Sequence, residues 1–279
     1  MERKNFFEPL EKDLVCLHKK SMPFTMQYHH HDGYEIFLFL NGDANYYIEE
    51  NCYQMKRGCL FNMRPNEMHR VECYDIKKYE RITINIRPKL LHDLSTKQTD
   101  LTRCFTDRPF GKDNLIYLYE HQINEFIFLA NNLEKIQNSS EYGHDLMARS
   151  YLYQILIFVN KIFLKKTQED PINIMPPIVS RTMLYINEHL TEQITMADIA
   201  NHVHHNPAYI SRCFKKVTGV SLQQYIIYKR IFLAKKYLME GYSLNDTCRL
   251  SGFNDYSNFA RTFKKQIGCS PKKFQKQPI

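Results

Sequence analysis

The chain has 279 residues, a formal net charge of +8 and eight cysteines, none of them in a Cys-x-x-Cys motif. This length allows two domains with separate cores. Single scattered cysteines are typical of reduced thiols rather than of disulfides or a thiolate zinc site, with a redox role for Cys52, Cys59 or Cys73 as the alternative. The N-terminus is charged and the apolar runs are short, so we expect a cytoplasmic protein without signal peptide or membrane contact.

Residues 24–118 are expected to form β structure, because segments rich in Ile, Tyr, Phe and Val alternate with turn-forming residues. The predicted strands are 34–40, 44–48, 59–63, 68–74 and 80–87. In the last of these, isoleucines occupy every second position from Ile82 to Ile86, and we assign this face to the interior. Many short strands at regular spacing indicate a barrel or a sandwich.

Histidines and one glutamate form a distinct pattern within this β region. His29, His31 and Glu35 have matching parity, so on an extended chain their side chains point to one side. A glycine seven residues after Glu35 and the distant Pro65 and His69 complete a pattern that resembles the cupin motifs, although the second motif is short and lacks its glycine. The resemblance implies a cupin-like barrel. In cupin enzymes such a set of side chains binds a divalent metal.

Three uses of this cluster remain open, namely a pocket for an organic ligand, a metal site, or histidines with a structural role. We favour a pocket for a small-molecule effector, without a metal or another cofactor. The residues expected to line it are His29, His31, Glu35, Phe37, Tyr46 and His69. In the metal alternative the ligands are His29, His31, Glu35 and His69, since imidazole and carboxylate suit divalent ions.

Two long helical patterns follow at 120–138 and 142–164. The second helix has a wider apolar face than packing on one sheet requires, and this favours dimerisation through these helices. The alternative is that both helices simply pack on the sheet. The polar, proline-containing segment 165–179 is predicted to be a linker.

The C-terminal third contains one motif twice. Phe-Lys-Lys-x-x-Gly-x-Ser begins at Phe214 and again at Phe263, and an arginine precedes each phenylalanine by two residues. Asn206-Pro207 is a strong start for the helix that carries the first copy. Each copy therefore has the pattern of a helix-turn-helix, with first helices expected at 196–203 and 244–250.

Positive charge is concentrated around these two copies. Residues 176–279 carry fifteen Lys and Arg against six Asp and Glu, a net charge of +9, whereas residues 1–175 carry −1. A helix fits the major groove of DNA, where arginine can bind guanine and lysine can pair with phosphate. The residues expected to contact DNA are Ala208, Tyr209, Ser211, Arg212, Lys215, Lys216, Ser257, Asn258, Arg261, Lys264 and Lys265. The alternative, that basic residues only solvate surface helices, is disfavoured by the repetition.

Segment 221–240, between the copies, is predicted to be one helix without internal glycine or proline. Twenty helical residues span about 30 Å, close to the ~34 Å at which major grooves recur on one face of a duplex. The connecting helix would therefore let one chain present its two recognition helices to successive grooves.

Residues 180–276 resemble the double helix-turn-helix domain of the AraC/XylS transcriptional regulators. The resemblance is carried by Ile199-Ala200, Arg230 in the connecting helix, Gly252-Phe253, Phe259-x-Arg261-x-Phe263-Lys264-Lys265 and Gly268-x-Ser270-Pro271. The sequence departs from the family pattern at His204-His205, where Gly-Phe is frequent, and at Cys248-Arg249, where Ala is usual. The resemblance implies sequence-specific DNA binding under the control of a sensor domain.

The sequence thus predicts an α+β multidomain protein with a cupin-like β-barrel, two following helices and an all-α double helix-turn-helix. The expected parts are an effector-sensing barrel at 1–118, a helical dimerisation segment at 119–164, a linker at 165–179 and a tandem helix-turn-helix DNA-binding domain at 180–279. We expect a transcriptional activator and no enzyme, with operator DNA, a second copy, an effector and RNA polymerase as partners. The alternatives are a metal-dependent cupin enzyme that carries a DNA-binding domain and a nonspecific architectural DNA binder.

Overall fold

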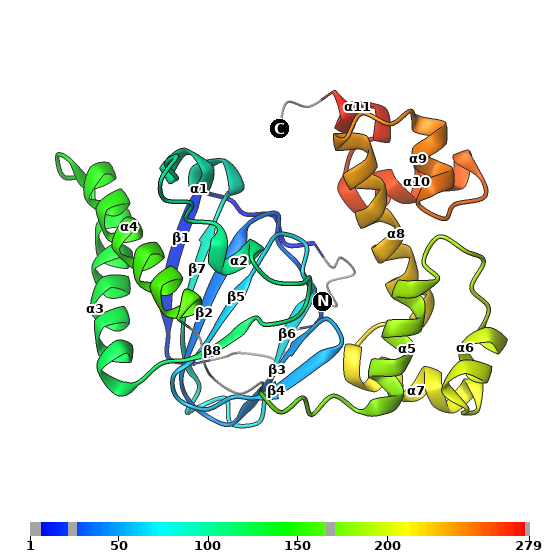
Figure 1. Ribbon diagram of the computed structural model, residues 1–279, viewed down its shortest axis with the longest axis horizontal. Coiled ribbons are helices and arrows are strands. Elements are labelled where there is room, and N and C mark those ends of the chain that lie inside the picture. The colour runs from blue at the N-terminus through cyan, green and yellow to red at the C-terminus, as the bar shows by residue number, and fades with distance from the viewer. Residues whose placement is uncertain (1–6, 22–26, 166–170, 277–279) are drawn as a thin grey trace. The chain divides into compact units, whose positions relative to one another are not determined.

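The computed structural model describes residues 7–21, 27–165 and 171–276 (Figure 1). The chain divides into two compact units, Glu8–Ile174 and a second unit that contains Phe7 and the residues from Met175 onward. The charged N-terminus, residues 166–170 of the predicted linker and the last three residues of the predicted DNA-binding domain lie outside the described residues. Within the described ranges, no helix combines the length and the apolar character that a membrane crossing requires.

The first unit contains two antiparallel sheets, of five strands in the order β1-β7-β2-β5-β8 and of three in the order β4-β3-β6. The strands are β1 Leu14–Lys19, β2 Tyr34–Asn41, β3 Ala44–Ile48, β4 Asn51–Gln54, β5 Cys59–Met63, β6 His69–Cys73, β7 Glu80–Ile86 and β8 Leu115–Tyr117. The predicted β fold is confirmed, as two sheets. All five predicted strands are present, whereas β1, β4 and β8 were not predicted.

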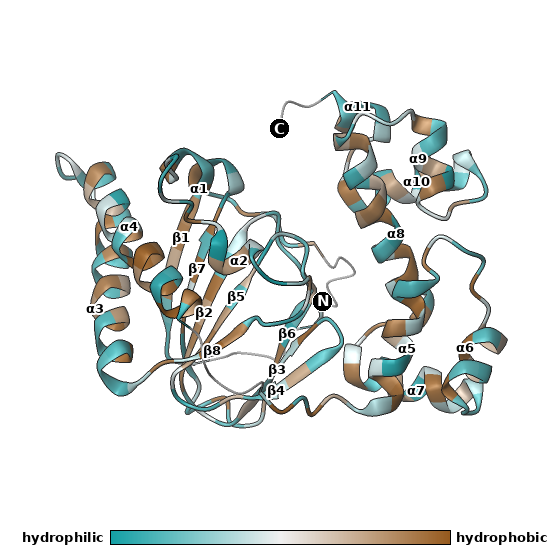
Figure 2. Ribbon diagram, in the orientation of Figure 1, coloured by the Kyte–Doolittle hydropathy of each residue, from teal (hydrophilic) through white to brown (hydrophobic). Residues whose placement is uncertain are grey.

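Strand β2 contributes to two separate cores, because successive side chains of a strand point to opposite faces. Phe37 and Phe39 pack with side chains of the three-stranded sheet, so this core lies between the sheets. Ile36 and Leu38 pack on the other side, against helices. Figure 2 shows hydrophobic residues along β2 and β7.

Among the described residues, four helices complete the first unit, namely α1 Pro88–Leu94, α2 Arg103–Thr106, α3 Glu120–Gln137 and α4 His144–Leu164. The predicted helices at 120–138 and 142–164 are confirmed, and both lie beside the five-stranded sheet (Figure 1). The segment 88–106, within the predicted β region, is partly helical instead, and Pro88 at the first turn of α1 favours a helix start there.

The isoleucines of β7 face these helices and not the space between the sheets. Ile82, Ile84 and Ile86 are fully buried, in one cluster with side chains of α3 and α4. Their burial was predicted correctly, but the assignment to the barrel interior was wrong, because both faces of the five-stranded sheet are covered. The alternating residues Thr83 and Asn85 consequently point into the space between the sheets.

The second unit is all-helical, as predicted. Its helices are α5 Pro177–Glu188, α6 Met196–Val203, α7 Pro207–Thr218, α8 Leu222–Met239, α9 Leu244–Leu250, α10 Tyr256–Ile267 and α11 Pro271–Gln275. Both first helices of the motif copies match their predicted bounds. Helix α5 begins within the segment predicted to be a linker, and its Val179 and Met183 are buried.

Candidate DNA-binding surface and effector cavity

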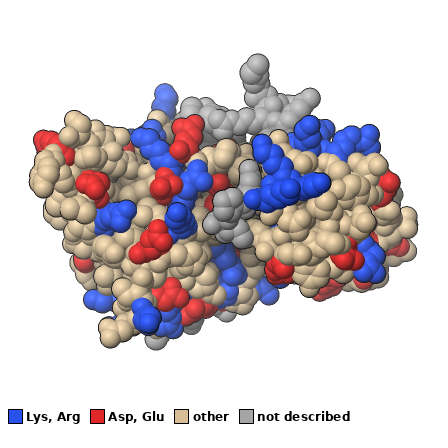
Figure 3. All heavy atoms as spheres, turned by 90° about the horizontal axis from the view of Figure 1, so that it is seen from above, with Lys and Arg blue, Asp and Glu red and all other residues tan. Residues whose placement is uncertain are grey.

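Helices α7 and α10 carry the repeated basic motif. Ile210 and Phe214 of α7 are buried, as are Phe259 and Phe263 of α10, so the remaining faces of both helices meet solvent. All eleven residues predicted to contact DNA are exposed, namely Ala208, Tyr209, Ser211, Arg212, Lys215, Lys216, Ser257, Asn258, Arg261, Lys264 and Lys265. Figure 3 shows Lys and Arg side chains gathered over this unit, on the right of the view.

Polar residues and glycines fix both ends of these helices. The side chains of Asn206 and Asp255 accept hydrogen bonds from the helix backbone at 2.8 and 2.6 Å. At the other ends, Gly219 and Gly268 have φ of 77° and 86°, a conformation that glycine adopts without steric cost. The helix start predicted from Asn206-Pro207 is thus confirmed, and a glycine follows the last residue of both helices.

The turns between the helices of each copy differ in strain. In the first copy His204 has φ 57° and ψ 43°, in the left-handed region where glycine is favoured. The equivalent residue of the second copy, Gly252, has φ 82°. At His204, where the family frequently has glycine, this chain therefore has a side chain on a backbone conformation that favours glycine.

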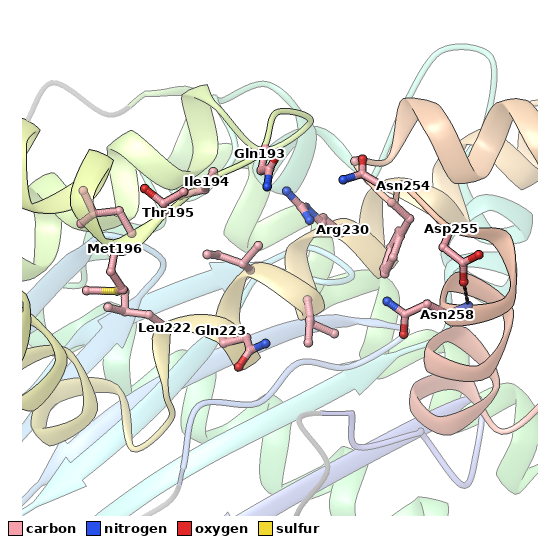
Figure 4. Close-up of a pocket in the computed structure, with 15 residues that line it drawn as sticks. Gln193, Ile194, Thr195, Met196, Leu222, Gln223, Arg230, Asn254, Asp255 and Asn258 are labelled. Carbon is pink, nitrogen blue, oxygen red and sulfur yellow. Dashed lines mark hydrogen bonds between the residues drawn. The ribbon is translucent and has the colours of Figure 1, made fainter.

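A cleft of about 460 Å³ lies between the two copies, along α8 (Figure 4). Thr195 and Met196, at the start of α6, line one end, and Asp255 and Asn258, at the start of α10, line the other. Arg230 of α8 lies between these ends (Figure 4). The cleft therefore adjoins the start of α10.

In the first unit, the six side chains predicted to bind an effector line one cavity of about 180 Å³, the effector cavity. His29 and His31 precede β2, Glu35 and Phe37 lie on β2, Tyr46 on β3 and His69 on β6. The structure brings all six together from segments that are up to forty residues apart in the sequence. The matching parity of His29, His31 and Glu35 had indicated one common side.

Other lining residues were missed by the sequence analysis. Arg81, Thr83 and Asn85 of β7 line the effector cavity, together with Glu8, Leu17 and Val71. The signal for the β7 residues was present, since they alternate with the buried isoleucines. It was misread because the isoleucine face was assigned to the interior.

Three histidine rings meet in the effector cavity. The ring centroids of His29 and His69 lie 4.5 Å apart, and those of His29 and His31 5.0 Å apart. Each ring places Nδ1 against a backbone carbonyl oxygen, at 2.9 Å for His29, 3.0 Å for His31 and 2.9 Å for His69. Because a carbonyl only accepts, Nδ1 carries a proton in each ring, and Nε2 faces other partners.

Glu35 places one carboxylate among these rings. Its Oε2 lies 3.1 Å from Nε2 of His31, and its Oε1 accepts a hydrogen bond from the Tyr46 hydroxyl at 3.3 Å. Burial raises the pKa of Glu35, but the hydrogen bond from His31 and the nearby imidazoles lower it, to about 2. Burial opposes the charge on His31, yet its bond to Glu35 leaves the pKa raised. Burial lowers the pKa of His29 and of His69.

The cluster also has the donor set of a divalent metal site. One ring nitrogen from each of His29, His31 and His69 lies within 4.8 Å of the other two, and Nε2 of His69 is buried without a hydrogen-bond partner among the described residues. Bonds from Nδ1–H to carbonyls are the supports that orient metal-binding histidines. The three rings with Glu35 would therefore fit a divalent ion. The same groups also suit hydrogen bonding to a polar organic ligand.

Comparison with known proteins identifies both units. The AraC-like ligand binding domain matches residues 11–156, and a helix-turn-helix domain matches residues 199–277. The probable transcriptional regulator LumQ of Photobacterium leiognathi is 24% identical over 249 residues, which cover 89% of this chain and 91% of LumQ.

Two further relatives match over shorter stretches. The uncharacterized HTH-type transcriptional regulator YobQ of Bacillus subtilis is 39% identical over 95 residues, which cover 34% of this chain and only 39% of YobQ. The lactose operon transcription activator of Staphylococcus xylosus is 26% identical over 179 residues, which cover 59% of this chain and 64% of that protein. With its ligand-binding and helix-turn-helix domains both matched, the chain belongs to the AraC family of transcriptional regulators.

Proposed function

We propose that this chain is a ligand-responsive, sequence-specific DNA-binding transcriptional regulator. The observation that carries the proposal is the basic surface that α7 and α10 both expose, with Arg212 and Arg261 at equivalent positions. A guanidinium in the major groove can donate two hydrogen bonds to one guanine, and neighbouring lysines can neutralise phosphates. Family membership supports the same role.

The length of α8 supports recognition of two adjacent DNA segments. The helix has 18 residues, which span about 27 Å, and major grooves recur every ~34 Å on one face of a duplex. Both recognition helices of one chain could therefore enter successive grooves. The partner is then a double-stranded operator with two segments for each chain.

Selection from random duplexes, followed by footprinting with the full chain, tests the proposal. We expect a preferred sequence with two protected segments about 10 base pairs apart. Binding without sequence preference would identify a nonspecific architectural DNA binder instead. Absence of DNA binding at any salt concentration would overturn the proposal.

The effector cavity supports control by a small, polar molecule. Its volume of about 180 Å³ is below the ~300–1,000 Å³ of sites for drug-sized ligands, so we propose an effector of few non-hydrogen atoms. His29, His31, Glu35 and His69 would supply polar contacts, and Phe37 and Tyr46 apolar ones. An effector changes DNA affinity only if it binds two arrangements of the protein with different affinity.

A second copy of the chain is the proposed partner of α4. Leu146, Tyr153, Ile157 and Leu164 are exposed large hydrophobic residues of this helix. Their spacing of seven, four and seven residues places them in one narrow stripe, as in a coiled-coil seam. An apolar stripe that the rest of the first unit leaves exposed supports dimerisation, and the operator would then contain two copies of the site.

We further propose that the regulator is an activator that acts in the cytoplasm and contacts RNA polymerase. Similarity to the lactose operon transcription activator supports activation. Deletion of the gene should lower transcription from a promoter that the protein protects. A rise in transcription would identify a repressor.

The second candidate is a metal-dependent enzyme that carries a DNA-binding domain. The observation that favours it is the group of three histidines and Glu35, which fits a divalent ion. One metal ion per chain together with turnover of a small substrate would support an enzyme. A regulatory role without catalysis remains our proposal, since the chain joins this cluster to two recognition helices.

A further inference from the structure

Arg230 ties the connecting helix to the first helix-turn-helix copy. Its Nε donates to the carbonyl of Leu190 at 2.9 Å, and its Nη2 donates to the carbonyl of Glu192 at 2.5 Å. Both carbonyls belong to the loop between α5 and α6. One planar guanidinium thus holds two points of this loop against α8.

The second copy touches the same loop at Gly252, in the turn between α9 and α10. A Cβ at this position would lie 2.7 Å from the carbonyl oxygen of Leu190, 2.8 Å from Nε of Arg230 and 3.1 Å from Cα of Thr191. These distances are shorter than side chains tolerate, and the contacts are mostly with backbone. The absence of a side chain at Gly252 therefore allows the turn to approach the loop of the first copy.

A positive φ alone does not require this close approach. Gly241, just after α8, has φ of 86°, nearly the same as the 82° of Gly252, but a Cβ there would meet nothing within 4 Å. A positive φ explains the glycine at position 241. Position 252 has a second requirement, which is contact between the two copies.

This contact lies beside the open cleft, which Arg230 and Gly252 both line. Helix α8 connects the copies but leaves this cleft of about 460 Å³ between them. Because this cleft is open, close packing of side chains across it does not fix the distance between the two copies. The bonds of Arg230 and the backbone contact at Gly252 provide a second constraint beside α8 itself.

We propose that Arg230 and Gly252 set the distance and angle between the two recognition helices, and so make the protein selective for one spacing of its two DNA segments. The inference rests on the proposed DNA-binding function. Arg230 is a positioning residue in this account, because it acts through the loop at 190–192. Two linked binding sites gain affinity only when the link matches the span between their targets.

The test measures how binding depends on the spacing of the two segments. Three duplexes are compared with the full chain: the selected site, the same site with one base pair inserted between its segments, and a single segment. One inserted base pair rotates the second segment by about 35°. For the wild type, we expect the insertion to weaken binding about tenfold or more, because one recognition helix loses its segment.

Two substitutions should reduce this spacing penalty. Arg230→Lys keeps the positive charge but replaces the planar guanidinium that bonds both carbonyls with one ammonium on a flexible stem, and Gly252→Ala forces the turn away from the loop. For each, we expect single-segment affinity within about twofold of the wild type and a spacing penalty at least about threefold smaller. Gly241→Ala is the matched control, with the same backbone strain and no clash, and should keep the full penalty.

If Arg230→Lys and Gly252→Ala both retain the wild-type spacing penalty, the inference is overturned while the DNA-binding function stands. Circular dichroism at the assay temperature shows which variants are folded. Should Gly252→Ala fail to fold, Arg230→Lys alone decides. Absence of binding to every duplex by the wild type would instead overturn the proposed function, and this inference with it.

Discussion

The carboxylate of Glu67 accepts two hydrogen bonds from the guanidinium of Arg108, at 2.7 and 2.8 Å, and both side chains are buried. The backbone N–H of Gly111 and the amide of Asn114 donate to the same carboxylate at 2.8 and 3.0 Å. The backbone carbonyl of Glu67 accepts the Nδ1–H of His69. This buried ion pair therefore supports one wall of the effector cavity.

Glu67→Gln should lower the free energy of unfolding of the first unit by about 3–5 kcal/mol, because Arg108 would remain buried without its counter-charge. Urea denaturation of the full chain measures the loss. The control is Glu120→Gln, which breaks the exposed pair of Glu120 with Arg57 and should cost much less, because water screens the attraction between exposed charges. Equal losses for the two variants would contradict a special role of the buried pair.

The same pair gives a pH dependence. Burial raises the pKa of Glu67, but Arg108 outweighs burial and leaves the pKa lowered. A lowered folded-state pKa stabilises the protein above the unfolded pKa of about 4.3, and this stabilisation is lost as the pH falls toward the folded value. The wild type should therefore lose stability below about pH 4 more steeply than Glu67→Gln.

Arginines and lysines of the recognition helices should differ in their effect on DNA binding. Arg212→Ala or Arg261→Ala should cost about 1–3 kcal/mol of specific binding, because base contacts are lost. Lys215→Ala or Lys264→Ala should weaken binding to all DNA sequences alike. Each should also reduce the slope of log K against log salt concentration by about one unit. Footprinting across a salt series separates the two classes. Full operator affinity in both arginine variants would refute the assignment of these helices.

The exposed stripe of α4 should hold two copies together. Leu146→Asp with Ile157→Asp should convert a dimer to a monomer in sedimentation experiments at tens of micromolar, because charges would replace the apolar seam. Met147→Asp is the control, since Met147 is exposed but lies about 100° away from the stripe on the helix. A wild-type chain that sediments as a monomer would remove the basis for the dimer.

The effector cavity should control the response without affecting DNA contact. His31→Ala with Glu35→Ala should abolish the response to inducer in a reporter assay, because both side chains line the cavity and supply polar contacts there. DNA affinity without inducer should stay within about twofold of the wild type. A normal response in the double variant would place the sensor elsewhere. Elemental analysis adds a second readout, since one divalent ion per chain that the double variant loses would identify a metal site.

Relief of the backbone strain in the turn of the first copy should stabilise the protein. His204→Gly should raise the stability of the second unit by about 0.5–1 kcal/mol, because the left-handed backbone strain at His204 exceeds the entropy cost of a glycine. Gly219→Ala, at φ 77°, should lower it by about 1 kcal/mol for the converse reason. Thermal unfolding of both variants measures these changes in stability. A destabilised His204→Gly variant would show that the imidazole makes compensating contacts.

Much of the second unit was predictable because its signals are local. Asn206-Pro207 marks the start of α7, and Gly219 and Gly268 mark the ends of α7 and α10. The exposure of the basic residues follows from the helical period, because the apolar residues of each helix occupy the opposite face. The contact between Gly252 and Leu190 was not predictable, since it joins residues sixty-two positions apart. In the first unit, the alternation in β7 predicted burial of Ile82–Ile86 correctly but could not tell which face the helices cover.

Strand β2 is a wall shared by the effector cavity and the helical layer. Glu35 and Phe37 face the cavity, while Ile36 and Leu38 pack in the cluster that includes α3 and α4. Protein interiors are close-packed, so a displacement of this strand on one side requires repacking on the other. Occupancy of the cavity and association through α4 would then be thermodynamically linked. Linkage is reciprocal, so the second copy would act on the effector as strongly as the effector acts on the second copy.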